Sequence, residues 1–310
     1  MNKRYSEAFE MQFIVTIKQF IKDVRSIIVG FFYSVKWKVF YQNKGYLLNE
    51  SRRDVPLIIS LTSFPGRIKI VSKTLKSILM QNDIKPDSIQ LWLAKEQFPK
   101  GVESLPAELK KLIKYGVEIK WCTDLRSYKK LVPCYAENRD AIIVTIDDDV
   151  YYSKYWLKTL YSSYLDKPNV VHCNKATKFV LKDDQYEAIS GGREYYNSPS
   201  FLNKLVGIGG VLYPPNSLYK DVLDEKLFKK LAPTNDDIWF WFMAILNGYR
   251  ISVVQNNKPK PIEVYEKIKS DKLTTINDNG DKLFWKQFDN MIKHYPSVNE
   301  LFKEELKFMA

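Results

Sequence analysis

The sequence has 310 residues, of which 45% are hydrophobic and 14% aromatic, so it can bury a large core and is not a disordered chain. Its cysteines show no CxxC or Cys/His spacing, which argues against a zinc site or a disulfide framework and indicates a reducing compartment. The formal net charge of +12 leaves nucleic acid, an anionic membrane surface and phosphorylated substrates open as partners.

The N-terminal segment, residues 1–53, carries half of the net charge, with ten Lys/Arg against four Asp/Glu. Apolar residues recur at helical spacing from Phe13 to Val35, which predicts one or two amphipathic helices. Aromatic and basic residues then mix, a composition that suits a membrane interface. We therefore expect residues 1–50 to contact the inner face of the cytoplasmic membrane. Docking on the catalytic domain and homodimerisation are the alternatives.

No signal peptide or membrane span is recognisable near the N-terminus. Residues 1–10 are charged and polar, without the apolar core of a signal peptide. The best apolar run, Ser26–Val35, is shorter than the roughly 18 residues that a spanning helix needs. We expect a cytoplasmic protein attached peripherally to the membrane.

From residue 54 onward, short apolar runs that predict buried strands alternate with helical stretches. Strands are expected at Pro56–Leu61, Ser88–Leu93, Val117–Trp121 and Ala141–Ile146. Helices are expected at Ile70–Gln81, Pro106–Tyr115 and Lys129–Asn138. This order predicts an α/β fold with a mostly parallel, Rossmann-like sheet flanked by helices, whose ligands bind beyond the carboxyl ends of the strands. The absence of GxGxxG and of a P-loop motif argues against a dinucleotide fold and a P-loop enzyme.

The last of these strands runs directly into three consecutive carboxylates, Asp147-Asp148-Asp149. Adjacent carboxylates repel one another unless a cation neutralises them. Mg²⁺ and Mn²⁺ suit such oxygen ligands and typically bind one or two carboxylates together with substrate phosphates. The triplet therefore predicts a metal site, with an acidic surface turn as the alternative.

The segment Ile146–Tyr152, followed by an expected helix at Lys154–Leu165, resembles the DxD region of GT-A-fold glycosyltransferases. The likeness is to bacterial family-2-like enzymes of capsule, exopolysaccharide and lipopolysaccharide clusters. Ser60–Arg67 resembles the first strand and nucleotide loop of such enzymes. Further similar segments are Trp121–Asp124, Gly207–Pro215 and Ala232–Trp241. The resemblance covers residues 56 to about 255 and leaves the N-terminal helix and the last fifty or so residues outside.

On the donor side, the resemblance implies a UDP-sugar and Mn²⁺ or Mg²⁺. It assigns Asp149 and Asp147 to the metal, Asp147 also to the ribose, and leaves Asp148 between these two roles. The metal would neutralise charge on the departing diphosphate. The other residues expected to bind the nucleotide-sugar are Thr62, Ser63, Arg67, Asp124 and Lys130.

On the acceptor side, Asp236-Asp237 resembles the acidic pair that activates the acceptor in inverting members. Asp237 is expected to be the general base and Asp236 an acceptor ligand. A helix cap at Thr234-Asn235-Asp236 is the alternative. Gly209, Gly210 and Trp239 are expected to bind the acceptor, although Gly207 and its neighbours also suit a turn and tryptophans in a helix usually fill core. The two histidines, His172 and His294, are interpreted as structural.

The resulting hypothesis is a metal-dependent, inverting hexosyltransferase of bacterial surface polysaccharide biosynthesis, with a lipid-linked or oligosaccharide acceptor. Inversion rests on Asp236-Asp237 alone, and retention is the alternative. The expected domains are the helical extension 1–53, a GT-A domain 54–270 divided at residue 153, and a helical segment 271–310. A sugar nucleotidyltransferase, or another metal-dependent nucleotide enzyme, is the first alternative, but Ser60–Arg67 has only one glycine where such enzymes carry a Gly-rich loop. A nucleic-acid-binding protein is disfavoured because half of the excess charge lies beside an apolar helical face.

Overall fold

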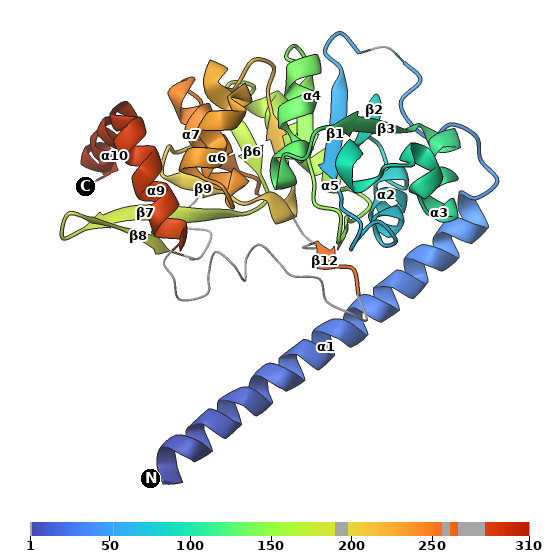
Figure 1. Ribbon diagram of the computed structural model, residues 1–310, viewed down its shortest axis with the longest axis horizontal. Coiled ribbons are helices and arrows are strands. Elements are labelled where there is room, and N and C mark those ends of the chain that lie inside the picture. The colour runs from blue at the N-terminus through green and yellow to red at the C-terminus, as the bar shows by residue number, and fades with distance from the viewer. Residues whose placement is uncertain (1, 52, 190–197, 256–260, 266–282, 310) are drawn as a thin grey trace.

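The computed structural model describes the chain apart from residues 1, 52, 190–197, 256–260, 266–282 and 310 (Figure 1). A seven-stranded sheet with the order β11-β6-β10-β4-β1-β2-β3 forms its centre. Its strands are β1 (Leu57–Thr62), β2 (Ser88–Ala94), β3 (Val117–Cys122), β4 (Ile142–Thr145), β6 (Val171–Cys173), β10 (Val211–Tyr213) and β11 (Ile251–Val253). Neighbouring strands are parallel except that β10 runs antiparallel to both β4 and β6. The predicted mostly parallel α/β fold is confirmed.

Helices cover both faces of this sheet. Ile58 of β1 belongs to one buried apolar cluster together with α7, while Leu57 and Ile59 belong to a second cluster together with α2 and α5. Burial on both faces explains why the strand reads as a continuous apolar run. The helices are α2 (Val71–Leu79), α3 (Ala107–Lys110), α4 (Val132–Glu137), α5 (Trp156–Asp166), α6 (Glu225–Leu231), α7 (Asp236–Leu246), α9 (Leu283–His294) and α10 (Pro296–Met309).

Two smaller sheets lie beside the central one. One contains β7 (Ala176–Lys182), β8 (Gln185–Ile189) and β9 (Asn203–Leu205) in the order β8-β7-β9. The other pairs β5 (Val150–Tyr151) with β12 (Ile262–Glu263) in antiparallel fashion. β5 starts directly after Asp149, so this small ribbon is the continuation of the acidic triplet.

Two predicted helices are shorter than expected. The helix predicted at 129–138 becomes a 3₁₀ turn at Arg126–Lys130 followed by α4. Pro133 explains the break, because proline has no backbone N–H to bond to residue 129 and fits only the first turn of a helix, so α4 starts beside it. The helix predicted at 106–115 is reduced to α3 and a later 3₁₀ turn at Ile113–Tyr115. Gly116, with a φ of +106°, ends this turn.

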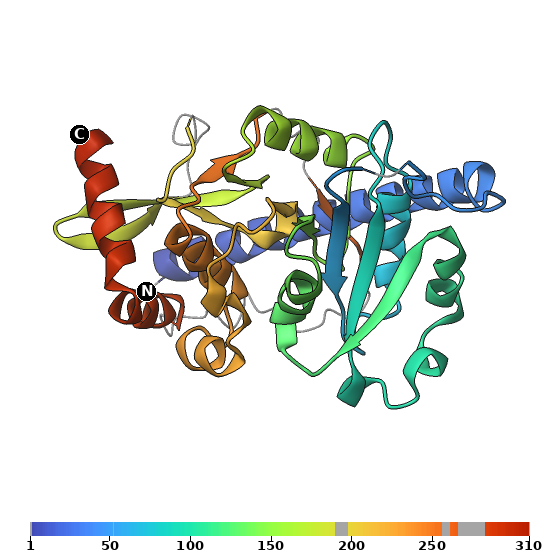
Figure 2. The same cartoon turned by 90° about the horizontal axis from the view of Figure 1, so that it is seen from above.

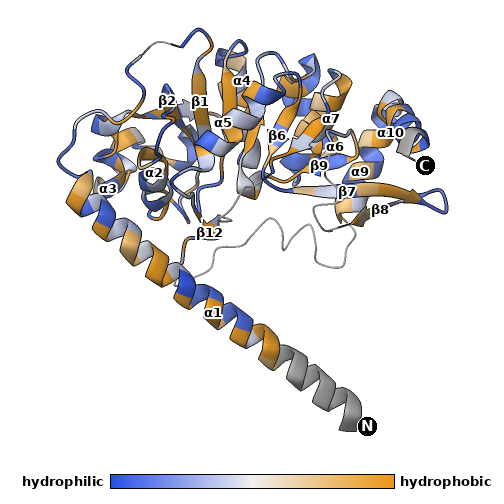
Figure 3. Ribbon diagram, turned by 180° about the vertical axis from the view of Figure 1, so that it is seen from behind, coloured by the Kyte–Doolittle hydropathy of each residue, from blue (hydrophilic) through white to orange (hydrophobic). Residues whose placement is uncertain are grey.

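The N-terminal segment is a single helix of 39 residues, α1 (Asn2–Phe40). It runs obliquely below the domain, and its N-terminal half points away from the domain (Figures 1 and 2). Apolar bands run along its described length (Figure 3). Within the part of the chain that the structure describes, no helix is both long and apolar enough to cross a bilayer.

His172, at the centre of β6, is fully buried and has a structural role, as predicted. Its Nε2 lies 2.9 Å from the carbonyl oxygen of Lys167 and its Nδ1 2.9 Å from Ser163 Oγ. A carbonyl only accepts, so Nε2 carries the proton and Nδ1 accepts from the Ser163 hydroxyl. Burial lowers the pKa of this imidazole to about 4.

This histidine predicts acid sensitivity. Between pH 6.5 and about 4 the unfolded chain takes up a proton that the folded chain refuses, so the contribution of His172 to stability falls as the pH falls. Linkage puts the full loss at about 3 kcal/mol. Urea unfolding at pH 7 and pH 4.5 should show a steeper loss of the free energy of unfolding for the wild type than for His172→Gln. Parallel pH profiles would contradict this assignment.

Candidate active site

The acidic triplet lies in the turn between β4 and β5, at the carboxyl end of the central sheet. The turn is held through its backbone by α2: the Thr74 hydroxyl donates to the Asp148 carbonyl at 2.8 Å and accepts from Val150 N at 3.1 Å. Asp147 N donates to the Tyr152 hydroxyl at 3.2 Å. These bonds fix the path of the turn, so its carboxylates are presented in a defined arrangement.

Asp148 and Asp149 meet the loop that follows β1. Arg67 Nη1 lies 3.1 Å from Asp148 Oδ1 and 2.9 Å from Asp149 Oδ2. The Ser63 hydroxyl donates to Asp148 Oδ2 at 2.5 Å. Burial raises the pKa of Asp148, and Arg67 and Ser63 offset part of that rise. Two of the predicted donor-binding residues are thus brought to the triplet, where they contact its carboxylates.

Lys130 lies between Asp147 and a second acidic group, the Asp236-Asp237 pair. Lys130 Nζ lies 2.8 Å from Asp236 Oδ2, 3.6 Å from Asp147 Oδ1 and 3.7 Å from Asp237 Oδ1. Burial opposes the charge on Lys130, but the three carboxylates outweigh it and hold its pKa well above the ordinary value. The sequence predicted Lys130 to approach a diphosphate; the structure places it between the triplet and the acidic pair.

The pKa of Asp147 distinguishes it within the triplet. Burial raises the pKa to about 6, against the pull of Lys130, and the neighbouring carboxylates of Asp149 and Asp237 add to the rise. The side chain nevertheless keeps 30% of its surface exposed. A partly exposed carboxylate that is costly to ionise is a group that gains from an added cation.

The acidic pair forms the first turn of α7. Asn235 is the N-cap, because its side chain accepts from Ile238 N at 3.1 Å, so neither aspartate is needed as a cap. Asp237 Oδ2 accepts from Gly207 N at 3.1 Å. The Asp237 side chain is 20% exposed and that of Asp236 only 9%. Asp237 is therefore the more accessible carboxylate of the pair.

Gly207 is the glycine that faces this centre. A Cβ there would stand 2.8 Å from Lys130 Nζ and 3.1 Å from Asp237 Oδ1. The prediction had instead assigned the acceptor to Gly209 and Gly210. A Cβ on Gly209 would meet Asn174 at 2.9 Å, and one on Gly210, whose φ is +90°, would meet the Trp156 ring at 2.4 Å. These two glycines accommodate the packing of protein side chains, and their contact with an acceptor stays a prediction.

Trp239 lies in the core, which corrects its prediction. It was predicted to stack on an acceptor sugar, but the side chain is completely buried. Its indole N–H donates to the Val222 carbonyl at 3.4 Å, and its ring packs edge-on against Phe228. The aromatic positions of α7 fill the core because the helix is surrounded by protein, and periodicity alone does not reveal this.

Thr62 and Asp124 both have protein partners. The Thr62 hydroxyl donates to the Trp92 carbonyl at 2.8 Å. Asp124 pairs with Lys129 Nζ at 2.5 Å and accepts from Gln97 Nε2 at 2.8 Å. Their roles toward a nucleotide remain predictions.

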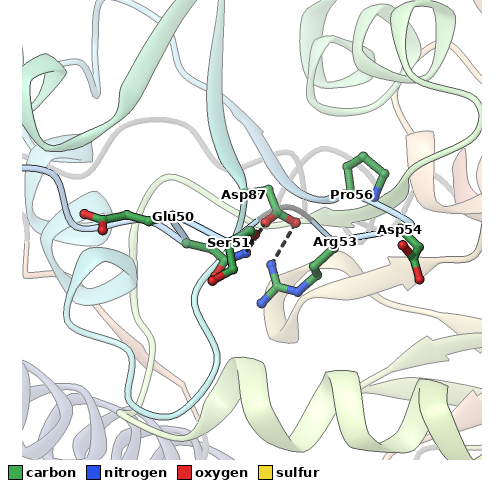
Figure 4. A pocket seen from close by; sticks show the side chains of 7 residues that line it. Glu50, Ser51, Arg53, Asp54, Pro56 and Asp87 are labelled. Carbon is green, nitrogen blue, oxygen red and sulfur yellow. Dashed lines mark hydrogen bonds and ion pairs between the residues drawn. The ribbon is translucent and has the colours of Figure 1, made fainter.

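A polar pocket lies at the other end of the sheet, near the start of β1 (Figure 4). Arg53 Nη1 contacts Asp87 Oδ2 there at 2.7 Å, and Asp87 also accepts from Leu57 N at 2.7 Å. These contacts attach the segment after α1 to the first two strands. The residues that line the pocket are Asn49, Glu50, Ser51, Arg53, Asp54, Pro56 and Asp87.

No family model matches this sequence and no curated protein matches it either. The structure is similar to that of TarS from S. aureus in complex with UDP-GlcNAc, with a TM-score of 0.50 and 12% sequence identity. The match covers 81% of this chain and 72% of that chain. The chain has the GT-A fold. A mannosyltransferase from Pyrobaculum calidifontis in complex with GDP-Man and Mn²⁺ is similar with a TM-score of 0.48, 12% identity, and coverage of 88% of this chain and 75% of that chain. Glucosyl-3-phosphoglycerate synthase from Mycobacterium tuberculosis in complex with Mn²⁺, UDP and phosphoglyceric acid has a TM-score of 0.44, 12% identity, and coverage of 77% and 79%.

The charges of this GT-A site fit a divalent cation. The triplet and the acidic pair supply five carboxylates, and Arg67 and Lys130 contact them with one positive charge each. Within the described residues, no group of three or more metal-ligating side chains is assembled to hold an ion alone. Mg²⁺ and Mn²⁺ commonly take only one or two carboxylates and complete their shell with phosphate and water. The assignment of such an ion to Asp149 and Asp147 stays a prediction.

Proposed function

We propose that the protein is a glycosyltransferase that uses a nucleotide-sugar donor. One observation carries the proposal: Asp147 of the strand-end triplet and the Asp236-Asp237 pair, 89 or more positions apart in the sequence, meet around Lys130 Nζ within 3.7 Å. Sugar transfer needs both halves of this arrangement. One must hold a diphosphate leaving group, and the other must take a proton from an acceptor hydroxyl.

The triplet is the donor half of the proposed site. Asp149 and Asp147 would hold Mn²⁺ or Mg²⁺, which as a Lewis acid stabilises the negative charge on the leaving diphosphate. Arg67, now paired with Asp148 and Asp149, provides a planar guanidinium suited to phosphate oxygens. UDP is the proposed nucleotide and a hexose the proposed sugar.

The acidic pair is the acceptor half. Asp237 accepts the proton of the acceptor hydroxyl as the acceptor oxygen bonds to the anomeric carbon and the bond from that carbon to the diphosphate breaks. Attack opposite the leaving group inverts the anomeric configuration. Lys130 places a positive charge among Asp147, Asp236 and Asp237. Gly207 lets Lys130 and Asp237 approach its backbone closely, and its N–H orients the Asp237 carboxylate.

Binding of UDP and Mn²⁺ tests this function. We expect the two together to raise the thermal unfolding midpoint, with little effect of UDP without metal. Asp149→Asn should abolish the shift, whereas Asp289→Asn, an exposed aspartate on α9, should retain it. A sugar nucleotidyltransferase would instead respond to a nucleoside triphosphate and release pyrophosphate from it with a sugar phosphate. A response only to an oligonucleotide would contradict both enzyme proposals.

We also propose that the acceptor is lipid-linked and that α1 holds the enzyme at a membrane surface, as in the assembly of bacterial surface polysaccharides. Of the twenty exposed large apolar side chains among the residues whose burial is described, fourteen lie on α1. Exposed apolar area of this extent, in a segment with net positive charge, suits the interface of an anionic bilayer.

Replacing apolar side chains on α1 tests the membrane proposal. Phe20 and Phe31 are 67% and 66% exposed. Changing both to glutamate should abolish sedimentation with vesicles containing phosphatidylglycerol, because two apolar anchors are lost and two negative charges added. Leu165→Glu on α5, where the leucine is 61% exposed, is the matched control and should sediment like the wild type. Equal sedimentation of all three proteins would reject α1 as the membrane contact.

A further inference from the structure

One face of α1 rests on the catalytic domain. Ser26 and Trp37 are buried, and Gly30 and Tyr33 lie between them at spacings of four, three and four residues, which places all four on the same side of the helix. The Ser26 hydroxyl donates to the Glu263 carbonyl at 2.6 Å. We call these four residues the inner stripe of α1.

The inner stripe contacts the polypeptide segment that leaves the acidic triplet. The Tyr33 ring lies 5.0 Å from the Tyr151 ring, centroid to centroid. The Tyr33 hydroxyl donates to the Tyr152 carbonyl at 2.8 Å. The backbone of Gly30 approaches Tyr151 closely, since a Cβ on Gly30 would lie 2.7 Å from the Tyr151 hydroxyl oxygen. β5, the strand directly after Asp149, is therefore packed against the helix.

Two connections lead from this contact to the triplet itself. Tyr152, whose carbonyl is held by Tyr33, accepts through its own hydroxyl from Asp147 N at 3.2 Å. β12, whose Glu263 is bound by Ser26 and Lys22, is continued by Val264, which donates from its backbone N to the Asp149 carbonyl at 2.6 Å. The positions of Asp147 and Asp149 thus depend on elements that α1 holds.

Docking of α1 also brings lysines together. Lys36 and Lys44 both make cation–π contacts with the Tyr41 ring, with their Nζ atoms 5.7 and 5.1 Å from its centroid. Burial, and then the charge of Lys154, lowers the pKa of Lys36. Burial, and then Lys44 and Lys36, lowers that of Lys85 to about 8. Lys85 and Lys154 belong to the domain and Lys36 to the helix, so mutual repulsion opposes docking unless anions lie among these lysines.

Anionic lipid headgroups would relieve this repulsion only when α1 is docked. A ligand shifts a conformational equilibrium only through different affinities for the two states, and this lysine cluster provides the difference. A second copy of the chain is a poorer occupant of the outer face of α1, because it brings the same positive charge. An anionic bilayer offers apolar depth and complementary charge together.

We propose that α1 couples an anionic bilayer to the donor site: lipid contact stabilises the inner stripe on β5 and thereby orders Asp147 and Asp149 for metal and nucleotide. The donor part of this inference rests on the proposed function. The ordering of residues 147–152 does not, and it is measurable without any nucleotide.

Hydrogen–deuterium exchange and UDP affinity, each with and without vesicles, test the coupling. Vesicles containing phosphatidylglycerol should slow amide exchange in a peptide spanning residues 147–152. They should also raise the affinity for UDP in Mn²⁺ by about five-fold or more, a usual size for coupling between sites. Pure phosphatidylcholine vesicles should do neither.

Gly30→Leu should uncouple the two effects. Its side chain collides with Tyr151, while the apolar outer face that binds vesicles is unchanged. The variant should therefore sediment with anionic vesicles yet show no slowing of exchange at 147–152 and no gain in UDP affinity. Gly45→Leu is the matched control, since a Cβ on Gly45 meets nothing within 4 Å, and it should respond like the wild type. Tyr33→Phe, which loses only the bond to Tyr152, should keep part of the response.

Three outcomes separate the possible failures. If wild type binds anionic vesicles without any change in exchange at 147–152, the coupling is wrong. Slowed exchange without UDP binding under any condition would support the coupling and overturn the proposed function. A stable dimer in solution with no binding to vesicles would show that α1 serves self-association, and would overturn this inference.

Discussion

Asp237→Asn is expected to lower kcat by about 10²–10⁴-fold, the usual contribution of a positioned general base. Asparagine keeps the size of the side chain and an oxygen that accepts from Gly207 N, but it cannot take the acceptor proton. Donor KM should change little, because the carboxylate belongs to the acceptor half. The thermal midpoint should hold or rise, since one of several mutually repelling carboxylates is removed.

Steady-state kinetics of the variant measure this effect, with transfer to an acceptor as the readout. Asp289→Asn should behave like the wild type. A kcat within about threefold of wild type for Asp237→Asn would contradict the role of Asp237, given the expected size of the general-base effect. A much larger loss in Asp236→Asn would transfer that role to Asp236.

Lys130→Met is expected to cause the largest loss of stability at this site, about 3–5 kcal/mol, the range observed when one partner of a buried charge network is removed. Methionine fills similar space without charge, so Asp147, Asp236 and Asp237 lose the cation that they share. The measurement is urea unfolding at pH 7 with and without Mn²⁺. We expect Mn²⁺ to stabilise Lys130→Met more than the wild type, because a divalent cation replaces part of the missing charge.

A companion variant keeps this prediction specific. Lys158 pairs with Asp83 and its side chain is 50% exposed, so Lys158→Met should leave unfolding almost unchanged. Adding Asp236→Asn to Lys130→Met should recover part of the lost stability, because it removes the carboxylate closest to the ammonium. Equal stability of Lys130→Met and wild type would mean that the lysine does not neutralise the acidic centre.

The central fold and half of the site were predictable from local pattern. Apolar runs bounded by turns defined the strands, and the strand ending in Asp147 placed the triplet at the ligand-binding edge of the sheet. Asp236 and Asp237 were recognisable as a second acidic pair. Ser63 and Arg67, predicted to bind the nucleotide-sugar, contact the triplet because the loop after the first strand of such a sheet reaches the same edge as the loop after β4.

The rest depended on contacts between distant residues. Lys130 was expected near a donor, but only the fold shows that it joins both acidic groups. Trp239 has the same sequence character as a sugar-stacking aromatic and differs only in being enclosed by protein. Gly207, Gly209 and Gly210 stand in one short motif, and which of them faces the centre depends on Trp156 and Asn174 packing against the other two.

The most direct test of the central claim is the release of nucleoside diphosphate from a panel of nucleotide sugars incubated with the enzyme and Mn²⁺. Glycosyltransferases of the proposed kind would hydrolyse their donor slowly without acceptor, so the assay can be run before the acceptor is known. We predict release from one UDP-sugar or a small set of them, dependent on added metal and lost in Asp149→Asn. Release from no nucleotide sugar, with pyrophosphate formed from a nucleoside triphosphate and a sugar phosphate, would contradict the account.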